Sequence, residues 1–65
     1  MFPLEQILSL IPKGYLITIL DVNGNTLFTA SCPAIIPYRY RDKMVVSIVQ
    51  GAIEVAIKLN ITEVG

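Results

Sequence analysis

The stretch 52–62 alternates apolar and polar side chains without a break. Its apolar members share one parity and most are β-branched: Ile53, Val55, Ile57, Leu59 and Ile61. A period of two predicts a half-buried strand whose apolar row faces a core. The same residues also fit a helix, in which Glu54 and Lys58 form an i,i+4 pair. Crowding of the β-branched side chains and the presence of Gly51 favour the strand.

A second apolar run, 44–49, precedes this strand and predicts its hairpin partner. Counting outward from a two-residue turn at Gln50-Gly51 joins apolar side chains on one face: Ile48 with Ile53, Val46 with Val55, and Met44 with Ile57. The last strand then outruns its partner. We therefore expect Leu59 and Ile61 on a free sheet edge, as part of an oligomer interface where another subunit adds a strand.

An earlier hairpin is predicted between strands 15–21 and 25–32, because Asn23-Gly24 suits the positive φ angles of a type I′ turn. Counting outward gives four cross-strand pairs: Leu20 with Leu27, Ile19 with Phe28, Thr18 with Thr29, and Ile17 with Ala30. One face of this hairpin is a core face. The other mixes polar side chains with Leu16, Leu20 and Leu27, and is a subunit interface, a ligand floor or a partly exposed sheet face.

Residues 3–11 predict a short amphipathic helix that docks on the sheet. Pro3 suits the first helical position, and the apolar side chains follow the spacing of one helical face: Leu4, Ile7, Leu8 and Ile11. Two prolines exclude a central strand from the connection 33–43, where Pro37 opens a helical turn through Tyr40. The predicted fold is one small α+β domain over 1–65, with a short N-terminal helix packed on a four-stranded antiparallel sheet made of two hairpins.

The composition indicates self-association. Of the 65 residues, 54% are hydrophobic and 15% are charged. A chain this short buries only about 60% of its unfolded surface, so many apolar side chains remain exposed on a monomer. Burial against identical subunits in a closed symmetric assembly is the commonest solution. We therefore expect a homo-oligomer.

The residue inventory argues against an enzyme. The chain has no histidine for acid–base catalysis or metal binding, and its acidic residues are scattered. No glycine-rich phosphate loop is present. Cys32 lacks an activating histidine, and we expect it to be a small buried thiol. We expect no catalytic residue, no metal site and no cofactor.

Charge and hydropathy limit the location and the partners. The net charge is zero, which argues against nucleic acid because a nucleic-acid coat needs a basic face. No window reaches the roughly 20 apolar residues of a membrane span. The start, MFPLEQ, lacks the basic region and the cleavage site of a signal peptide. A single cysteine allows no intrachain disulfide, so we expect a cytoplasmic protein.

The segment 38–43 is the main polar cluster of the chain. It interleaves tyrosines with basic residues: Tyr38, Arg39, Tyr40, Arg41 and Lys43. Arginine binds phosphate in a bidentate manner and tyrosine rings stack on bases, so we expect an anion or nucleotide pocket that neighbouring subunits build up. The alternative is a solvated turn, in which Arg41 or Lys43 pairs with Asp42 and the tyrosines cap the edge of the core.

Apolar positions and turn residues together form a pattern over nearly the whole chain: Leu4, Ile7, Leu8, Ile11, Pro12, Ile17, Ile19, Asp21, Gly24, Leu27, Ile36, Pro37, Tyr38, Asp42, Lys43, Val46, Ile48, Ile53, Val55 and Ile57. In this pattern the chain resembles short uncharacterised proteins encoded by phages and mobile elements of Gram-positive bacteria. Members of that group usually carry more charge, and a glycine where this chain has Ser31-Cys32. The resemblance implies a phage protein in the cytoplasm of a bacterial host cell, with a role in countering host defence.

Two functions fit this setting. The first is a homo-oligomer that sequesters a cyclic-nucleotide or ADP-ribose-type immune signal at the segment 38–43. The second is a protein–protein inhibitor or adaptor, which offers a strand edge or the face with Leu16, Leu20 and Leu27 to a host defence protein. A single-strand nucleic-acid binder is a third option, and zero net charge argues against it.

Overall fold

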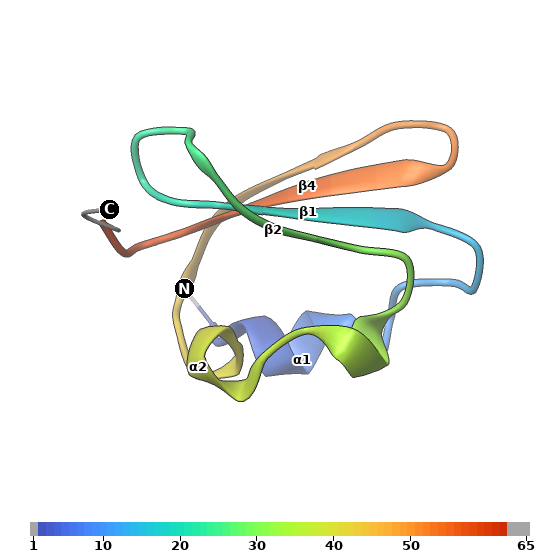
Figure 1. The fold of residues 1–65 in the computed structure, drawn as a ribbon, viewed down its shortest axis with the longest axis horizontal. Coiled ribbons are helices and arrows are strands. Elements are labelled where there is room, and N and C mark those ends of the chain that lie inside the picture. Colours follow the sequence, from blue (N-terminus) through green and yellow to red (C-terminus); the bar gives the residue numbers. More distant parts are fainter. Residues whose placement is uncertain (1, 63–65) are drawn as a thin grey trace.

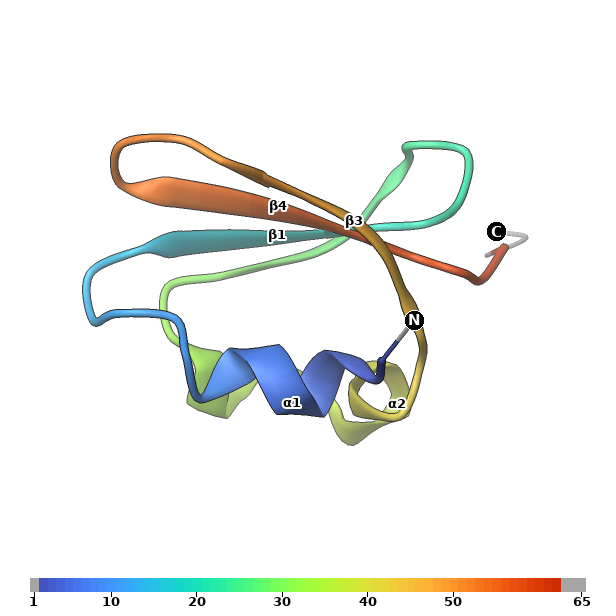
Figure 2. The ribbon, with the colours of Figure 1, turned by 180° about the vertical axis from the view of Figure 1, so that it is seen from behind.

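The computed structural model describes residues 2–62. A helix, two strands, two short helical turns and two strands follow one another: α1 (Leu4–Leu8), β1 (Leu16–Leu20), β2 (Thr26–Ala30), the 3-10 turn η1 (Pro33–Ile35), α2 (Tyr38–Arg41), β3 (Val45–Gln50) and β4 (Glu54–Leu59). The strands form one layer and the helical elements form a second layer on one side of it (Figure 1). In the view from behind, the described residues place no helix on the other side of the sheet (Figure 2). The predicted α+β class is confirmed.

The sheet is mixed, with the strand order β2-β1-β4-β3. The β1–β2 and β3–β4 pairs are antiparallel, but β1 and β4 run parallel at the centre, so the prediction of a purely antiparallel sheet is wrong. The connection explains the difference. Because β2 and β3 run in the same direction, the chain must return along the sheet, which takes about a dozen residues or more. Residues 31–44 make this return beneath the sheet, through η1 and α2 (Figure 1).

β4 lies at the centre of the sheet, and its buried row neighbours the buried row of β1. Ile17 pairs with Val55 and Ile19 with Ile57 in the parallel register. Leu59 continues this row and is 0% exposed, so the expectation that it lies on a free edge is wrong. Ile61 is half-buried, and its carbonyl accepts a hydrogen bond from the Val22 N–H at 2.8 Å. β4 therefore takes an internal position in the sheet, where both of its edges are paired.

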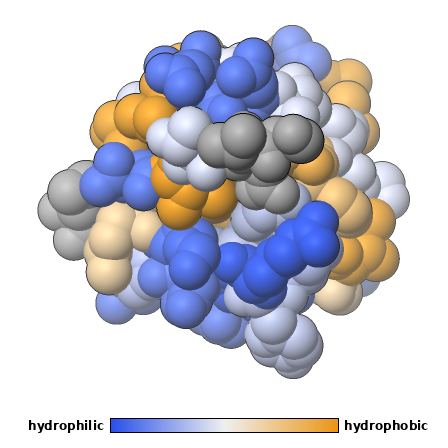
Figure 3. Space-filling view, turned by 60° about the vertical axis from the view of Figure 1, so that its left-hand side comes forward, coloured by the Kyte–Doolittle hydropathy of each residue, from blue (hydrophilic) through white to orange (hydrophobic). Residues whose placement is uncertain are grey.

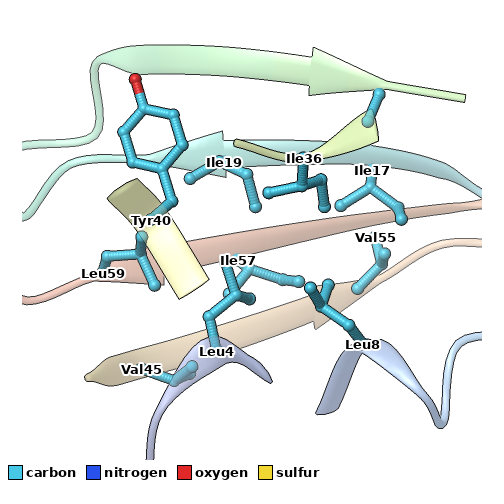
Figure 4. Close-up of a cluster of buried hydrophobic side chains, with 11 residues drawn as sticks. Leu4, Leu8, Ile17, Ile19, Ile36, Tyr40, Val45, Val55, Ile57 and Leu59 are labelled. Atoms are coloured by element: carbon cyan, nitrogen blue, oxygen red, sulfur yellow. The ribbon is translucent and has the colours of Figure 1, made fainter. Parts of the chain in front are cut away.

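The helical layer covers this buried row. α1 contributes Leu4 and Leu8, α2 contributes Tyr40, and Ile36 comes from the connection; all four point into the core (Figure 4). Ile7 and Ile11 pack at its margin, as the helical spacing predicts. The helix itself is shorter than the predicted 3–11 and ends at Leu8. An isolated helix of this length is unstable in water, so docking on the sheet stabilises it.

The β1–β2 register agrees with the prediction for three pairs: Ile17 with Ala30, Thr18 with Thr29, and Ile19 with Phe28. Leu20, however, lies opposite Thr26 and not opposite Leu27, because the register shifts beside Ile19. Asp21 is the physical reason. Its Oδ1 accepts the backbone N–H groups of Asn23 and Asn25, each at 2.9 Å, and organises a longer loop. Gly24 alone in this loop has positive φ, at 89°, so the type I′ turn is wrong.

The β3–β4 register differs from the prediction. Ile48 lies opposite Ile57 and Val49 opposite Ala56, and the Gly51 N–H donates to the Glu54 carbonyl at 2.7 Å. The turn therefore lies at residues 52–53 and not at Gln50-Gly51. From Ser47 to Gln50, each β3 residue faces a β4 residue four positions further on than predicted. Because this shift is even, these residues keep the predicted side of the sheet. The irregularity between Val45 and Ser47 reverses the parity at Val45, which is buried and faces Leu59.

Candidate protein-interaction surface

The predicted ligand segment 38–43 forms α2 and the turn after it, at one end of the helical layer (Figure 1). Figure 3 looks onto this end of the molecule, where hydrophilic side chains gather. Tyr40 is 2% exposed, and its ring centroid lies 6.4 Å from that of Phe28. Its hydroxyl accepts a hydrogen bond from Arg39 Nη2 at 2.9 Å. Tyr40 is thus a core residue, and its ring is not available for stacking on a base.

Arg41 holds the connection together. Its Nε donates to the carbonyl of Ile36 at 3.0 Å, and its Nη2 donates to the carbonyls of Pro33 and Ala34 at 2.9 Å and 3.3 Å. Its Nη1 lies 3.7 Å from a carboxylate oxygen of Glu5 on α1. The guanidinium therefore joins η1 to α2 and faces α1, which leaves little of it for a phosphate.

Lys43 and Tyr38 complete the segment. Lys43 Nζ lies 3.6 Å from a carboxylate oxygen of Asp42, as in the alternative of a solvated turn. Tyr38 is 80% exposed, and the Arg41 Cζ lies 4.9 Å from its ring centroid. The five predicted ligand residues are therefore divided: Tyr40 and Arg41 belong to the fold, Tyr38 and Arg39 lie at the surface, and Lys43 is half-buried beside Asp42.

The predicted leucine face is only partly a surface. Leu16 is exposed on the sheet face without helices, and Leu20 is half-buried there, beside a shallow groove lined in part by Thr18 and Val49. Leu27 packs against the core cluster, because the register shift turns it away from Leu20. Leu16 and Leu20 remain candidates for an interface, whereas the structure places Leu27 and Leu59 in or against the core.

The other chemical candidates are few. Cys32 is exposed, so the expectation of a buried thiol is wrong. Within residues 2–62, no group of three or more His, Cys, Asp or Glu side chains is arranged to hold a metal ion. No helix in this part of the chain is long and apolar enough to cross a membrane.

β3 is the feature that the sequence reasoning misplaced. Among residues 2–62, β4 is the one strand that pairs with β3, so the other side of β3 is an edge of the sheet. All of its residues after Val45 are exposed, and Val49 is 68% exposed. No charged side chain occurs between positions 44 and 53. This uncharged run was the feature of the sequence that could have indicated an exposed edge strand. The predicted register paired its apolar side chains with Ile53 and Val55, and so treated them as buried.

The backbone of β3 presents free hydrogen-bonding groups at this edge. In an antiparallel ladder, residues alternate between those bonded to the neighbouring strand and those that point away. Gly51 is bonded to Glu54, so the residues two and four positions before it, Val49 and Ser47, also direct their backbone groups toward β4. Ile48 and Gln50 therefore direct their N–H and C=O groups outward, toward an unpaired side.

The N-terminal segment covers only the beginning of this edge. Pro3 bridges to Met44 in the antiparallel sense. The Val45 N–H donates to the Phe2 carbonyl at 2.8 Å, and the Leu4 N–H donates to the Lys43 carbonyl at 2.9 Å. The covered part ends at Val45, and 46–50 is the free edge of β3.

An apolar groove of about 190 Å³ lies beside the free edge, on the helical side of the sheet. Ile7, Leu10 and Ile11 line one wall, from α1 and the turn after it, while Ile48 and Val55 line the other. Leu10 is 76% exposed at the groove. The free edge thus combines unpaired backbone groups with an apolar depression next to them.

Comparison with known proteins gives no relative. No family model, curated protein or solved structure matches the chain.

Proposed function

We propose that this chain is a non-enzymatic binding protein, which takes up an extended protein segment as an added strand on the free edge of β3. The observation that carries the proposal is the exposed, uncharged stretch 46–50 with outward backbone groups. Strand addition gains affinity from main-chain hydrogen bonds and specificity from pockets for alternate side chains. Ile48 and Gln50 supply the backbone groups, and the groove beside Ile48 supplies a pocket.

The state of the edge supports this function. Proteins usually protect an edge strand with charges, proline, bulges or covering segments. β3 has a register irregularity between Val45 and Ser47 and the covering N-terminal segment, both at its beginning. The remainder has none of these protections, which suits a surface that is paired when the protein works. In the phage setting implied by the resemblance, the protein would act as an inhibitor or adaptor of a host defence protein.

The test uses two variants that differ only in position. Ile48 and Leu16 are both 44% exposed, on the edge and on the open face respectively. Wild type, Ile48→Lys and Leu16→Lys serve as baits in a host lysate, and the captured partner is identified and purified. We expect Ile48→Lys to weaken its binding at least tenfold and Leu16→Lys to leave it unchanged. Hydrogen exchange of the purified complex should protect the Ile48 and Gln50 amides. Full binding by Ile48→Lys contradicts the proposal.

Sequestration of a nucleotide-type signal is a second candidate, supported by the exposed side chains of Tyr38 and Arg39. Calorimetric titration with cyclic dinucleotides and ADP-ribose tests it. Tyr38→Ala and Arg39→Ala should each lower the affinity at least tenfold, since an aromatic stack and a cation are lost. The absence of binding to the wild type, or unchanged affinity in both variants, contradicts this candidate.

A further inference from the structure

We infer that the strand added to β3 is the β3 strand of a second copy of this chain, so that two copies share one continuous sheet around a two-fold axis. The inference rests on the proposed function, because it concerns the same strand-binding edge, with a second copy in place of a host protein as the added strand. It differs from an interface at Leu16, Leu20 or Ile61, because those residues lie on or just after the internal strands β1 and β4, whereas β3 is an edge strand.

The outward backbone groups match a copy of themselves. In an antiparallel pair, two residues whose groups point toward each other exchange two hydrogen bonds. With the two-fold axis at Val49, Ile48 of one copy stands opposite Gln50 of the second, and the converse holds. The outward backbone groups of Ile48 and Gln50 are then hydrogen-bonded in both copies. The added strand does not collide with the N-terminal segment along 46–50, because that segment covers β3 only as far as Val45.

The charge pattern agrees with self-pairing. A two-fold axis places each side chain close to its own counterpart, and like charges opposite each other destabilise a strand pair. The run 44–53 carries no charge, so no repulsion arises along the shared strands. Val49, 68% exposed in one copy, would face Val49 of the second copy on the side of the sheet without helices.

The extent of the apolar surface favours a second copy over an isolated strand. Of the eleven large exposed hydrophobic side chains in the described residues, seven lie on β3 or beside it: Phe2, Leu10, Met44, Val46, Ile48, Val49 and Ile53. A single added strand reaches the groove only with its alternate side chains, so much of this apolar surface, Leu10 included, stays in water. A two-fold axis perpendicular to the sheet puts both helical layers on the same side, so the two grooves adjoin beneath the shared strands. Such an isologous contact is the commonest form of self-association.

Cysteine crosslinking tests the register. Val49→Cys is made in a Cys32→Ser background, beside Ser47→Cys as the matched control. Facing residues of a non-hydrogen-bonded antiparallel pair have Cα atoms about 4.5 Å apart, within the range of about 4.4–6.8 Å for a disulfide. Ser47 instead faces Gly51 of the second copy, so its two thiols are far apart. We expect Val49→Cys to form a disulfide-linked dimer under mild oxidation and Ser47→Cys to stay reduced. Failure of Val49→Cys, or equal crosslinking of both, overturns this register.

Sedimentation equilibrium tests the partner. We expect a wild-type dimer, at least a thirtyfold higher dissociation constant for Val49→Lys, and no change for Leu16→Lys. An unchanged circular dichroism spectrum shows that Val49→Lys is folded. A monomeric wild type at all concentrations overturns the inference. If that monomer still captures a partner that Ile48→Lys loses, the proposed function stands; if no segment binds at β3, both fail.

Discussion

Arg41 shows how a residue suited to binding phosphate can be taken up by the fold. The connection 31–44 has little regular structure, so several of its carbonyls have no partner in a helix or strand. A planar guanidinium with five donors can satisfy carbonyls from more than one turn at once. Arg41 does this for Pro33, Ala34 and Ile36, and it thereby fixes η1 against α2.

Replacing Arg41 should therefore destabilise the domain. We expect Arg41→Ala to lower the free energy of unfolding by about 2 kcal/mol, the range for hydrogen bonds to a charged group. Arg41→Lys should recover only part of this, since an ammonium lacks the planar fork. Urea unfolding at equal protein concentration measures both variants. Lys13→Ala, an exposed basic residue before β1, is the control and should change stability by less than about 0.5 kcal/mol; an equal loss in this control would argue against the assigned role.

Asp21 has a comparable role in the β1–β2 loop. It is 0% exposed, and its carboxylate accepts two backbone N–H groups and the Asn25 side-chain amide, the last at 3.1 Å. We expect Asp21→Ala to cost about 2–3 kcal/mol, because the loop loses three hydrogen bonds to a charged acceptor. Asp21→Asn keeps one acceptor oxygen and should cost less. Asp42→Ala, with an exposed side chain, serves as the control in thermal unfolding. A stability for Asp21→Ala equal to that of the control would refute this account.

At the scale of elements, the local patterns predicted more than the pairing did. Periodicity located both strands of each pair and the apolar face of α1, since these depend on side-chain burial every two or every 3.6 residues. Both predicted turn positions were wrong. In the β1–β2 loop the Asp21 side chain sets the length of the loop, and in the β3–β4 loop Gly51 packs closely against Glu54. The mixed topology was missed because the connection 31–44 was treated as a short link. The free edge followed from that topology, so it could not be found from the pattern of β3 alone.

Gly51 illustrates the difference between a turn residue and a close contact. Its φ is not positive, but a Cβ there would lie 2.9 Å from the Glu54 Cγ. We expect Gly51→Ala to lower stability by about 1 kcal/mol through this overlap. With Glu54→Ala as the second change, the same substitution should become neutral or stabilising by about 0.4–1 kcal/mol, because alanine restricts the unfolded chain. A double-mutant cycle by urea unfolding measures the coupling, and additive effects would show that the overlap is not the cause.

At the scale of the whole molecule, a small hydrophobic domain that pairs through β3 gains stability from association. The free energy of unfolding of a dimer rises with protein concentration, because the partner binds the folded chain and not the unfolded one. Each tenfold rise in concentration should add about 1.4 kcal/mol per mole of dimer. The urea midpoint of the wild type should therefore increase with concentration, while that of Val49→Lys stays constant. A concentration-independent midpoint for the wild type would show that the native state is a monomer.

The bridge between Pro3 and Met44 has a practical consequence for how the protein is produced. Phe2 and Leu4 run antiparallel to β3, so a polypeptide fused ahead of Phe2 is aimed along the same side of β3. A purification tag at the amino end, in an extended conformation, would reach Ile48 and Gln50 after a few residues and compete with any other strand there. A tag at the carboxyl end would avoid this competition, and so would removal of an amino-terminal tag before the assay.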